Sequence, residues 1–220
     1  RQELWCNDLK RLGISTLLIN DYNELEDILK DISKKSRGKT VFVTGSHNSN
    51  SEDVRDLGRL MAMNPEVVLL SGQSAGVGSN VAAAFTEECI NNKTDIMNRI
   101  KIFPNPYAAN KKYSDNPILI PDLKRCRVKL LNSAQVVVVF GGGIGTEAEV
   151  ELAIKQNCYL IPVITEKEDR NNKALVSILN NDENMESIKM KAPEYHKKLL
   201  DKEAVTSMEE VNQCIMSLIK

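Results

Sequence analysis

The chain has 220 residues, enough for one domain with an appendage, and its 42% hydrophobic content can build a sizeable core. Its 29 basic and 30 acidic residues leave a formal net charge of −1, which excludes the basic excess typical of proteins that bind nucleic acid non-specifically. No apolar run approaches the roughly 18 residues that a membrane-spanning helix needs, and no signal-peptide pattern is present.

The cysteines and histidines exclude two further classes of protein. The five cysteines are scattered and never paired as CxxC, which is typical of reduced thiols in a cytosolic protein and not of a disulfide framework or a zinc site. With only His47 and His196, a histidine-rich metal centre is not expected. We therefore predict a cytoplasmic protein that binds no metal, no nucleic acid and no membrane.

The first part of the chain is separable from the rest. It begins at Arg1 within an amphipathic pattern and without an initiating methionine, which is typical of a piece of a longer protein. A helix, a strand (15–19) and a second helix (23–33) are predicted, followed by the polar connector 34–39. We place the domain boundary in this connector, so that residues 1–38 form an appendage and residues 39–220 form the main domain.

Short β-branched runs alternate with helical periods over the rest of the chain. Their nearly continuous apolar character is typical of strands that are buried on both faces. We therefore predict an α/β domain, a Rossmann-like parallel sheet with helices on both faces. The expected strands are 40–44, 67–70, 100–103, 136–140 and 159–164, and the expected helices are 52–63, 79–90, 122–132, 146–155 and 208–219. The asparagine-rich stretch 171–191 is expected to be a mobile surface loop.

Glycine-rich turns follow three of the predicted strands. Right-handed crossovers place all three at the carboxyl edge of the sheet, where α/β proteins bind ligands. Glycine lets backbone N–H groups approach an anion, and Gly145 in particular is expected to need a positive φ. The turns predict a phosphate cradle, although a single such turn is equally typical of a tight strand-to-helix connection. They are Gly45-Ser46-His47, Ser71–Gly78 with Gly72 and Gly76, and Gly141–Thr146 with Gly142, Gly143 and Gly145.

Neither of the common nucleotide-binding motifs is present. GxxxxGK[ST] is missing, which disfavours a P-loop kinase or ATPase, and GxGxxG is missing, which disfavours the usual dinucleotide fingerprint. Among side chains near the turns, Arg127 is a candidate for gripping a phosphate or ribose, and a solvated helix face is the alternative. Glu149 is a candidate acceptor for ribose hydroxyls or a general base; the alternative is favourable placement in the first turns of a helix.

Four further side chains are weaker candidates. Ser46 is a candidate hydroxyl donor to a phosphate, and His47 is a ligand contact or an exposed loop histidine. Phe103 and Tyr107 end another strand at the same edge, where an aromatic ring could stack on adenine; for Phe103, core packing is the favoured interpretation.

Two of the glycine segments together resemble the SLOG superfamily, which includes Lonely-Guy-type phosphoribohydrolases and DprA-like proteins. The segments are SGQSAGVGSNVAAAF (71–85) and GGGIGTEAE (141–149). The superfamily's second motif, PGGxGTxxE, is matched by Gly142, Gly143, Gly145, Thr146 and Glu149, with Gly141 in place of the proline. The resemblance covers roughly residue 39 to the C-terminus, and catalytic arginines of the hydrolase branch fall close to Arg127.

The first part of the chain restricts the resemblance to one group of SLOG-containing proteins. GISTLLINDYNELEDIL resembles the closing strand and helix of bacterial sirtuin-like domains. A sirtuin-like domain followed by SLOG is the layout of the NAD-consuming effectors of Thoeris antiphage defence. The resemblance implies a regulatory domain that binds a cyclic ADP-ribose isomer made by a partner TIR protein and thereby activates NAD hydrolysis in the sirtuin-like domain.

On that implication this chain is itself non-catalytic and holds no cofactor, and NAD belongs to the parent protein. A homo-oligomer is also expected. The alternative is a phosphoribohydrolase that cleaves the N-glycosidic bond of a nucleoside 5′-monophosphate. A DprA-like single-strand DNA binder is disfavoured because the basic excess is missing. The predicted ligand-binding residues are Gly45, Ser46, His47, Gly72, Gly76, Arg127, Gly142, Gly143, Gly145, Thr146 and Glu149.

Overall fold

The computed structural model describes residues 37–45, 51–103 and 120–220, together with Leu25, Ile28, Leu29 and Ile32. The chain divides into two compact units, residues 1–36 and residues 37–220, and the following description concerns the second. The candidate residues Ser46, His47 and Tyr107 lie outside the described residues. The boundary placed between residues 38 and 39 stays a prediction.

Five parallel strands form one sheet in the order β3-β2-β1-β4-β5. The predicted fold class is confirmed, because the strands are parallel and alternate with helices along the chain. The strand order reverses between β1 and β4, which is the switch point at which doubly wound sheets bind ligands. The strands are β1 (Thr40–Gly45), β2 (Val68–Ser71), β3 (Ile100–Ile102), β4 (Val136–Phe140) and β5 (Tyr159–Pro162).

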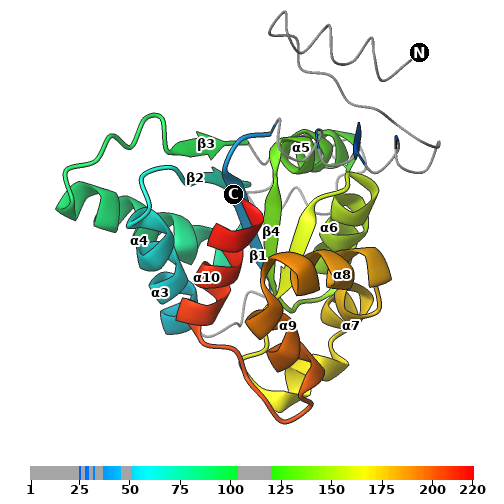
Figure 1. Cartoon of the computed structure of the whole chain (residues 1–220). Coiled ribbons are helices and arrows are strands. Elements are labelled where there is room, and N and C mark those ends of the chain that lie inside the picture. Colours follow the sequence, from blue (N-terminus) through cyan, green and yellow to red (C-terminus); the bar gives the residue numbers. More distant parts are fainter. Residues whose placement is uncertain (1–24, 26–27, 30–31, 33–36, 46–50, 104–119) are drawn as a thin grey trace, which may run out of the picture. The chain divides into compact units, whose positions relative to one another are not determined.

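Helices cover both faces of the sheet (Figure 1). On one side α3 packs against α4 and α10, and on the other α5 packs against α6, which in turn contacts α7. The five residues of β4 are all buried, as expected for a central strand between two helical layers. The helices are α3 (Ser51–Ala62), α4 (Val77–Asn91), α5 (Ile120–Ser133), α6 (Ile144–Lys155), α7 (Lys173–Leu179), α8 (Asp182–Lys191), α9 (Pro193–Leu200) and α10 (Met208–Leu218), with the short 3-10 helix η2 (Lys167–Asn171).

The prediction of a mobile loop over 171–191 is wrong, because this stretch forms α7 and α8. Leu175, Ile178 and Ile188 are fully buried in the core, which a mobile loop would not allow. The asparagines begin the helices: Asn172 caps α7, and Asn181 caps α8 by accepting a hydrogen bond from the Asn184 amide. Asparagine is among the preferred N-cap residues because its side-chain oxygen accepts from a free helical N–H group.

The edge of the sheet at β5 is closed by side chains of the C-terminal layer. Asn184 accepts from the Leu160 N–H at 2.8 Å and donates to the Leu160 carbonyl at 2.9 Å, as a neighbouring strand would. Thr206 accepts from the Ile164 N–H just beyond β5. These bonds satisfy backbone groups that an edge strand would leave open, and they fix α8 and the segment before α10 to the sheet. In the described part of the chain, no helix combines the length and apolarity needed to cross a membrane.

Candidate functional site

The last residue of β1, Gly45, lies against the end of β4 and the start of the turn that follows it, at the carboxyl edge of the sheet. Gly45 pairs with Phe140 in the parallel register. A Cβ added to Gly45 would meet the Phe140 Cβ at 2.7 Å and the Gly141 carbonyl oxygen at 3.2 Å. The close approach of the ends of β1 and β4 therefore requires glycine at position 45, whatever the role of Gly45 toward a ligand.

Positive φ angles occur at the glycines before α4 and α6, and not at Gly145. Gly76 has φ 73°, Gly141 has φ 66° and Gly142 has φ 152°. The expectation that Gly145 needs a positive φ is wrong, because α6 already begins at Ile144 and Gly145 is helical. The backbone reverses at the residue pair 141–142, before the helix begins, and only glycine adopts those angles readily.

Two helices begin at this edge without a side-chain cap. The N-cap residues of α4 and α6 are Gly76 and Gly143, and neither has a side chain to accept from the first helical N–H groups. By contrast, α7, α8 and α10 are capped by the side chains of Asn172, Asn181 and Ser207. The free N–H groups and the helix dipole leave the edge ready to receive an anion.

Glu149 is the centre of a small polar network beside the turn before α6. Its Oε1 accepts from the Arg127 Nε at 3.1 Å, and its Oε2 accepts from the Thr44 hydroxyl at 2.5 Å. The Arg127 side chain is 30% exposed and that of Glu149 15%, so solvent or a ligand reaches both. A Cβ on Gly145 would lie 3.4 Å from the Arg127 Nη2, which places the guanidinium beside the glycine turn.

A hollow between α5 and the sheet connects this network to the turn after β2. Its volume is about 60 Å³, too small to enclose a nucleotide, so a ligand of that size would lie largely along the open edge. Phe103 is half-buried, packs against the core and also contributes to the hollow. The lining residues are Phe42, Gly72, Ser74, Phe103, Leu123, Cys126, Arg127, Leu130, Leu131 and Glu149.

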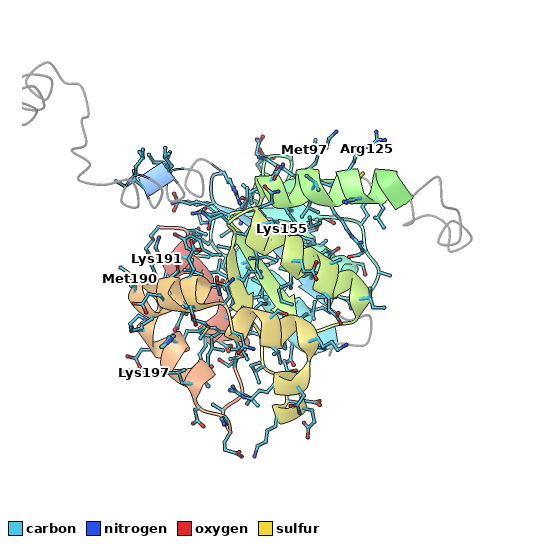
Figure 2. All side chains as sticks on the ribbon, turned by 90° about the vertical axis from the view of Figure 1, so that its right-hand side faces the viewer. Met97, Arg125, Lys155, Met190, Lys191 and Lys197 are labelled. Carbon is cyan, nitrogen blue, oxygen red and sulfur yellow. The ribbon has the colours of Figure 1, made fainter. Side chains whose placement is uncertain are left out.

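The structure thus brings together Arg127, Glu149, Gly72 and the turn at Gly142–Gly145, with Thr146 buried in the first turn of α6. Arg125 is exposed on the outer side of α5, as Figure 2 shows, so it lies away from the network.

Sequence reasoning missed two side chains. Thr44 is a buried hydroxyl near the carboxyl end of β1, and nothing in the sequence distinguishes it from Thr40, which is buried in the same strand. The Asn172 Nδ2 donates to the Gly142 carbonyl at 2.9 Å, a contact hidden by the prediction of a mobile loop over 171–191.

The arrangement combines donors for an anion with an acceptor for hydroxyls. The N–H groups at the start of α6 and the Arg127 guanidinium suit phosphate oxygens, and the Glu149 carboxylate suits ribose hydroxyls. Among the described residues, no group of three or more histidine, cysteine, aspartate or glutamate side chains could hold a metal ion.

A doubly wound α/β sheet with uncapped helices at its carboxyl edge defines a class of ligand-binding domain. Within that class the family is clear from the sequence. Residues 24–220 match the Sir2- and TIR-associating SLOG family (STALD), and the chain belongs to this family.

Several proteins called NAD(+) hydrolase ThsA are similar to this chain. That of Bacillus cereus (strain MSX-D12) is 26% identical, and the match covers 74% of this chain and 36% of that protein. That of Enterococcus faecium is 25% identical with the same coverage. That of Acinetobacter baumannii (strain 532279) is 30% identical over 47% of this chain and 24% of that protein. The chain therefore spans about a third of the length of the curated relatives it matches.

Two solved structures are similar to parts of this chain. DNA processing protein A from Streptococcus pneumoniae has a TM-score of 0.47 at 15% identity, covering 78% of this chain and 60% of that chain. The molybdenum cofactor carrier protein from Chlamydomonas reinhardtii has a TM-score of 0.45 at 18% identity, covering 82% of this chain and 98% of that chain.

Proposed function

We propose that the domain of residues 39–220 binds a cyclic ADP-ribose isomer and thereby activates an NAD-hydrolysing sirtuin-like domain that precedes it in a longer protein. The signal would be made by a TIR-domain protein, and the system would act in antiphage defence in the cytoplasm. The parent protein would work as a homo-oligomer, while this domain would hold no cofactor and contact neither nucleic acid nor a membrane.

The observation that carries the proposal is the Arg127–Glu149 pair beside the uncapped start of α6. A cyclic ADP-ribose isomer has a pyrophosphate and ribose hydroxyls within one compact molecule. The N–H groups after Gly143 would receive the phosphate oxygens, and the guanidinium would add charge-assisted bonds. Among the described residues Arg127 forms its hydrogen bond through Nε alone, so its terminal nitrogens can turn to a ligand.

The family and the relatives support the regulatory part of the proposal. The family is described as associating with Sir2 and TIR proteins, and the relatives are called NAD(+) hydrolases. A sensor needs a ligand that binds one conformation more tightly than another. Gly45 packs closely against Phe140 and Gly141, so a movement of the turn that begins at Gly141 would be felt at the end of β1.

The test is a titration of the chain with cyclic ADP-ribose isomers by calorimetry, with linear ADP-ribose and AMP as controls. We expect saturable binding of one cyclic isomer and weaker binding of the linear compound. In the longer protein, the same isomer should start NAD consumption. Failure of every cyclic isomer to bind the folded chain would refute the proposal.

The second candidate is a phosphoribohydrolase, which the same pair of side chains favours. An arginine that grips the phosphate and a carboxylate near the glycosidic bond are the groups that such a reaction needs. Thr44 and Arg127 each hold one oxygen of Glu149, which fixes the carboxylate and leaves acceptor capacity for either role. We favour binding over turnover because the family is described as associating with Sir2 and TIR proteins.

A further inference from the structure

The Asn172 side chain makes two hydrogen bonds with different partners. Its Oδ1 accepts from the Ala174 N–H at 3.1 Å and so caps α7. Its Nδ2 donates to the Gly142 carbonyl at 2.9 Å, across a gap of 30 residues in the sequence. One amide thus joins the start of a core helix to the glycine turn of the candidate site.

The bond to Gly142 determines the direction of an N–H group in the site. In a trans peptide the C=O and the following N–H point in opposite directions, because the unit is planar. Holding the Gly142 carbonyl toward Asn172 therefore directs the Gly143 N–H away from α7. Gly142 has φ 152° and Gly141 has φ 66°, so without this bond two glycines would be free to take many other conformations.

Asn172 is itself held rigidly. It begins α7, whose residues Ala174, Leu175 and Ile178 are fully buried, and α7 contacts both β4 and β5. A Cβ on Gly141 would lie 3.4 Å from the Asn172 Cγ, so the amide already packs against the turn. A side chain that is fixed by two bonds on a core helix is suited to orient a flexible turn.

We propose that Asn172 is a positioning residue of the ligand site, which orients the Gly142–Gly143 peptide so that the N–H groups before α6 converge on the ligand's phosphates. The inference rests on the proposed function for the identity of the ligand. Asn172 touches the turn and not the ligand. It acts by lowering the number of conformations that the turn must abandon on binding.

The substitution Asn172→Ser separates the two bonds. Serine caps a helix about as well as asparagine, but its side chain is shorter and does not reach Gly142. Asn172→Asp is a second variant: it is isosteric and keeps the cap, but it places an acceptor opposite the Gly142 carbonyl. The matched control is Asn181→Ser, because Asn181 is also a half-buried N-cap and its side chain accepts a cap bond from the Asn184 amide.

We expect Asn172→Ser to weaken binding of the cyclic ADP-ribose isomer about three- to tenfold in calorimetry, the equivalent of one hydrogen bond. Asn172→Asp should weaken it further. The melting temperatures of Asn172→Ser and Asn181→Ser should agree closely, and Asn181→Ser should bind like the unsubstituted chain. Equal affinity of Asn172→Ser and the unsubstituted chain would overturn the inference.

A second measurement on the free protein separates this inference from the proposed function. The amide resonances of Gly143, Ile144 and Gly145 should shift in Asn172→Ser and stay in place in Asn181→Ser. If no cyclic isomer binds the unsubstituted chain, the proposed function fails and the amide shifts still decide whether Asn172 positions the turn. Unchanged resonances of these three amides would refute the role of Asn172 even if the ligand binds.

Discussion

At the scale of single residues, two arginines show how differently the same side chain is used. Arg99 is 6% exposed, and its guanidinium donates to the carbonyls of Ala62 at 2.8 Å and Val67 at 3.2 Å. It also lies 4.9 Å from the centre of the Phe85 ring. Arg127 is 30% exposed and bonds a carboxylate through one nitrogen. Arg99 therefore serves the fold, whereas Arg127 has donors to offer a ligand.

Replacing Arg127 by alanine should weaken ligand binding and leave the fold intact. A lost charge-assisted hydrogen bond costs about 1.5–3 kcal/mol, which corresponds to roughly a 10- to 150-fold rise in Kd. Calorimetry with the cyclic ADP-ribose isomer measures the change, and a thermal melt checks the fold. Arg125→Ala is the matched control, because Arg125 lies on the outer side of the same helix (Figure 2). Equal losses in both variants would contradict the assignment.

Arg99→Met should lower the stability of the fold and leave ligand binding unchanged, the reverse of Arg127→Ala. Methionine keeps much of the apolar contact with Phe85 but leaves the carbonyls at the end of α3 without donors. We expect the free energy of unfolding in urea to fall by about 3 kcal/mol, because several buried acceptors lose their partners. Affinity for the ligand, measured on the folded fraction, should stay within twofold. A stable Arg99→Met variant would show that water replaces the guanidinium.

At the scale of elements, the glycines at the carboxyl ends of β1 and β4 have different physical requirements. Gly45 lacks space for a side chain, Gly141 and Gly142 need positive φ, and Gly143 has neither restriction. An added Cβ on Gly143 meets nothing within 4 Å, and its φ of −95° suits any residue. Only at Gly143 can a substitution test the approach of an anion without disturbing the turn itself.

Gly143→Ala and Gly45→Ala should therefore separate binding from stability. Gly143→Ala should change the free energy of unfolding by less than about 1 kcal/mol, the usual difference between N-cap residues. It should still weaken ligand binding, because its methyl group stands beside the N–H groups of α6. Gly45→Ala should lower stability by about 1–3 kcal/mol through overpacking against Phe140. If Gly143→Ala binds normally in calorimetry, the turn is not the anion site.

The elements that can be predicted well from the sequence are those with a strong local signal. Strands β1, β2, β4 and β5 are almost entirely buried, and their short runs of valine, isoleucine and leucine are typical of strands that are covered on both faces. The edge strand β3 is largely exposed and has the weakest such signal. By contrast, α7 and α8 carry no such signal, because they are short and their asparagine caps resemble loop composition. The contacts of Thr44 with Glu149 and of Asn172 with Gly142 join residues 105 and 30 positions apart, so no local pattern contains them.

At the scale of the whole domain, the reactivity of Cys126 can be used to measure access to the hollow beside the site. Cys126 is half-buried and lines the hollow together with Arg127. Burial raises the pKa of the Cys214 thiol to about 12, and Cys89 and Cys158 are buried. Because the thiolate is the reactive form and needs access, Cys126 should be alkylated first among these four.

Ligand binding should slow the alkylation of Cys126. Iodoacetamide labelling at pH 8, followed by mass spectrometry, measures the rate at each cysteine with and without the cyclic isomer. The buried Cys214 serves as the internal control, because its rate should stay low in both conditions. Full protection by AMP but none by the cyclic isomer would favour the phosphoribohydrolase.

The last prediction concerns the fate of the ligand, which the domain should release unchanged. A sensor gains from differential affinity for two conformations, about 10⁴-fold to move a switch from nearly off to nearly on, and not from destroying its signal. Glu149 would accept ribose hydroxyls while Thr44 and Arg127 hold its two oxygens. The chain should be incubated with the cyclic isomer and, separately, with AMP, and free adenine and ribose 5-phosphate sought by chromatography. We expect neither product. Steady adenine release from AMP that disappears in Glu149→Gln would show that the domain is a phosphoribohydrolase and not a sensor.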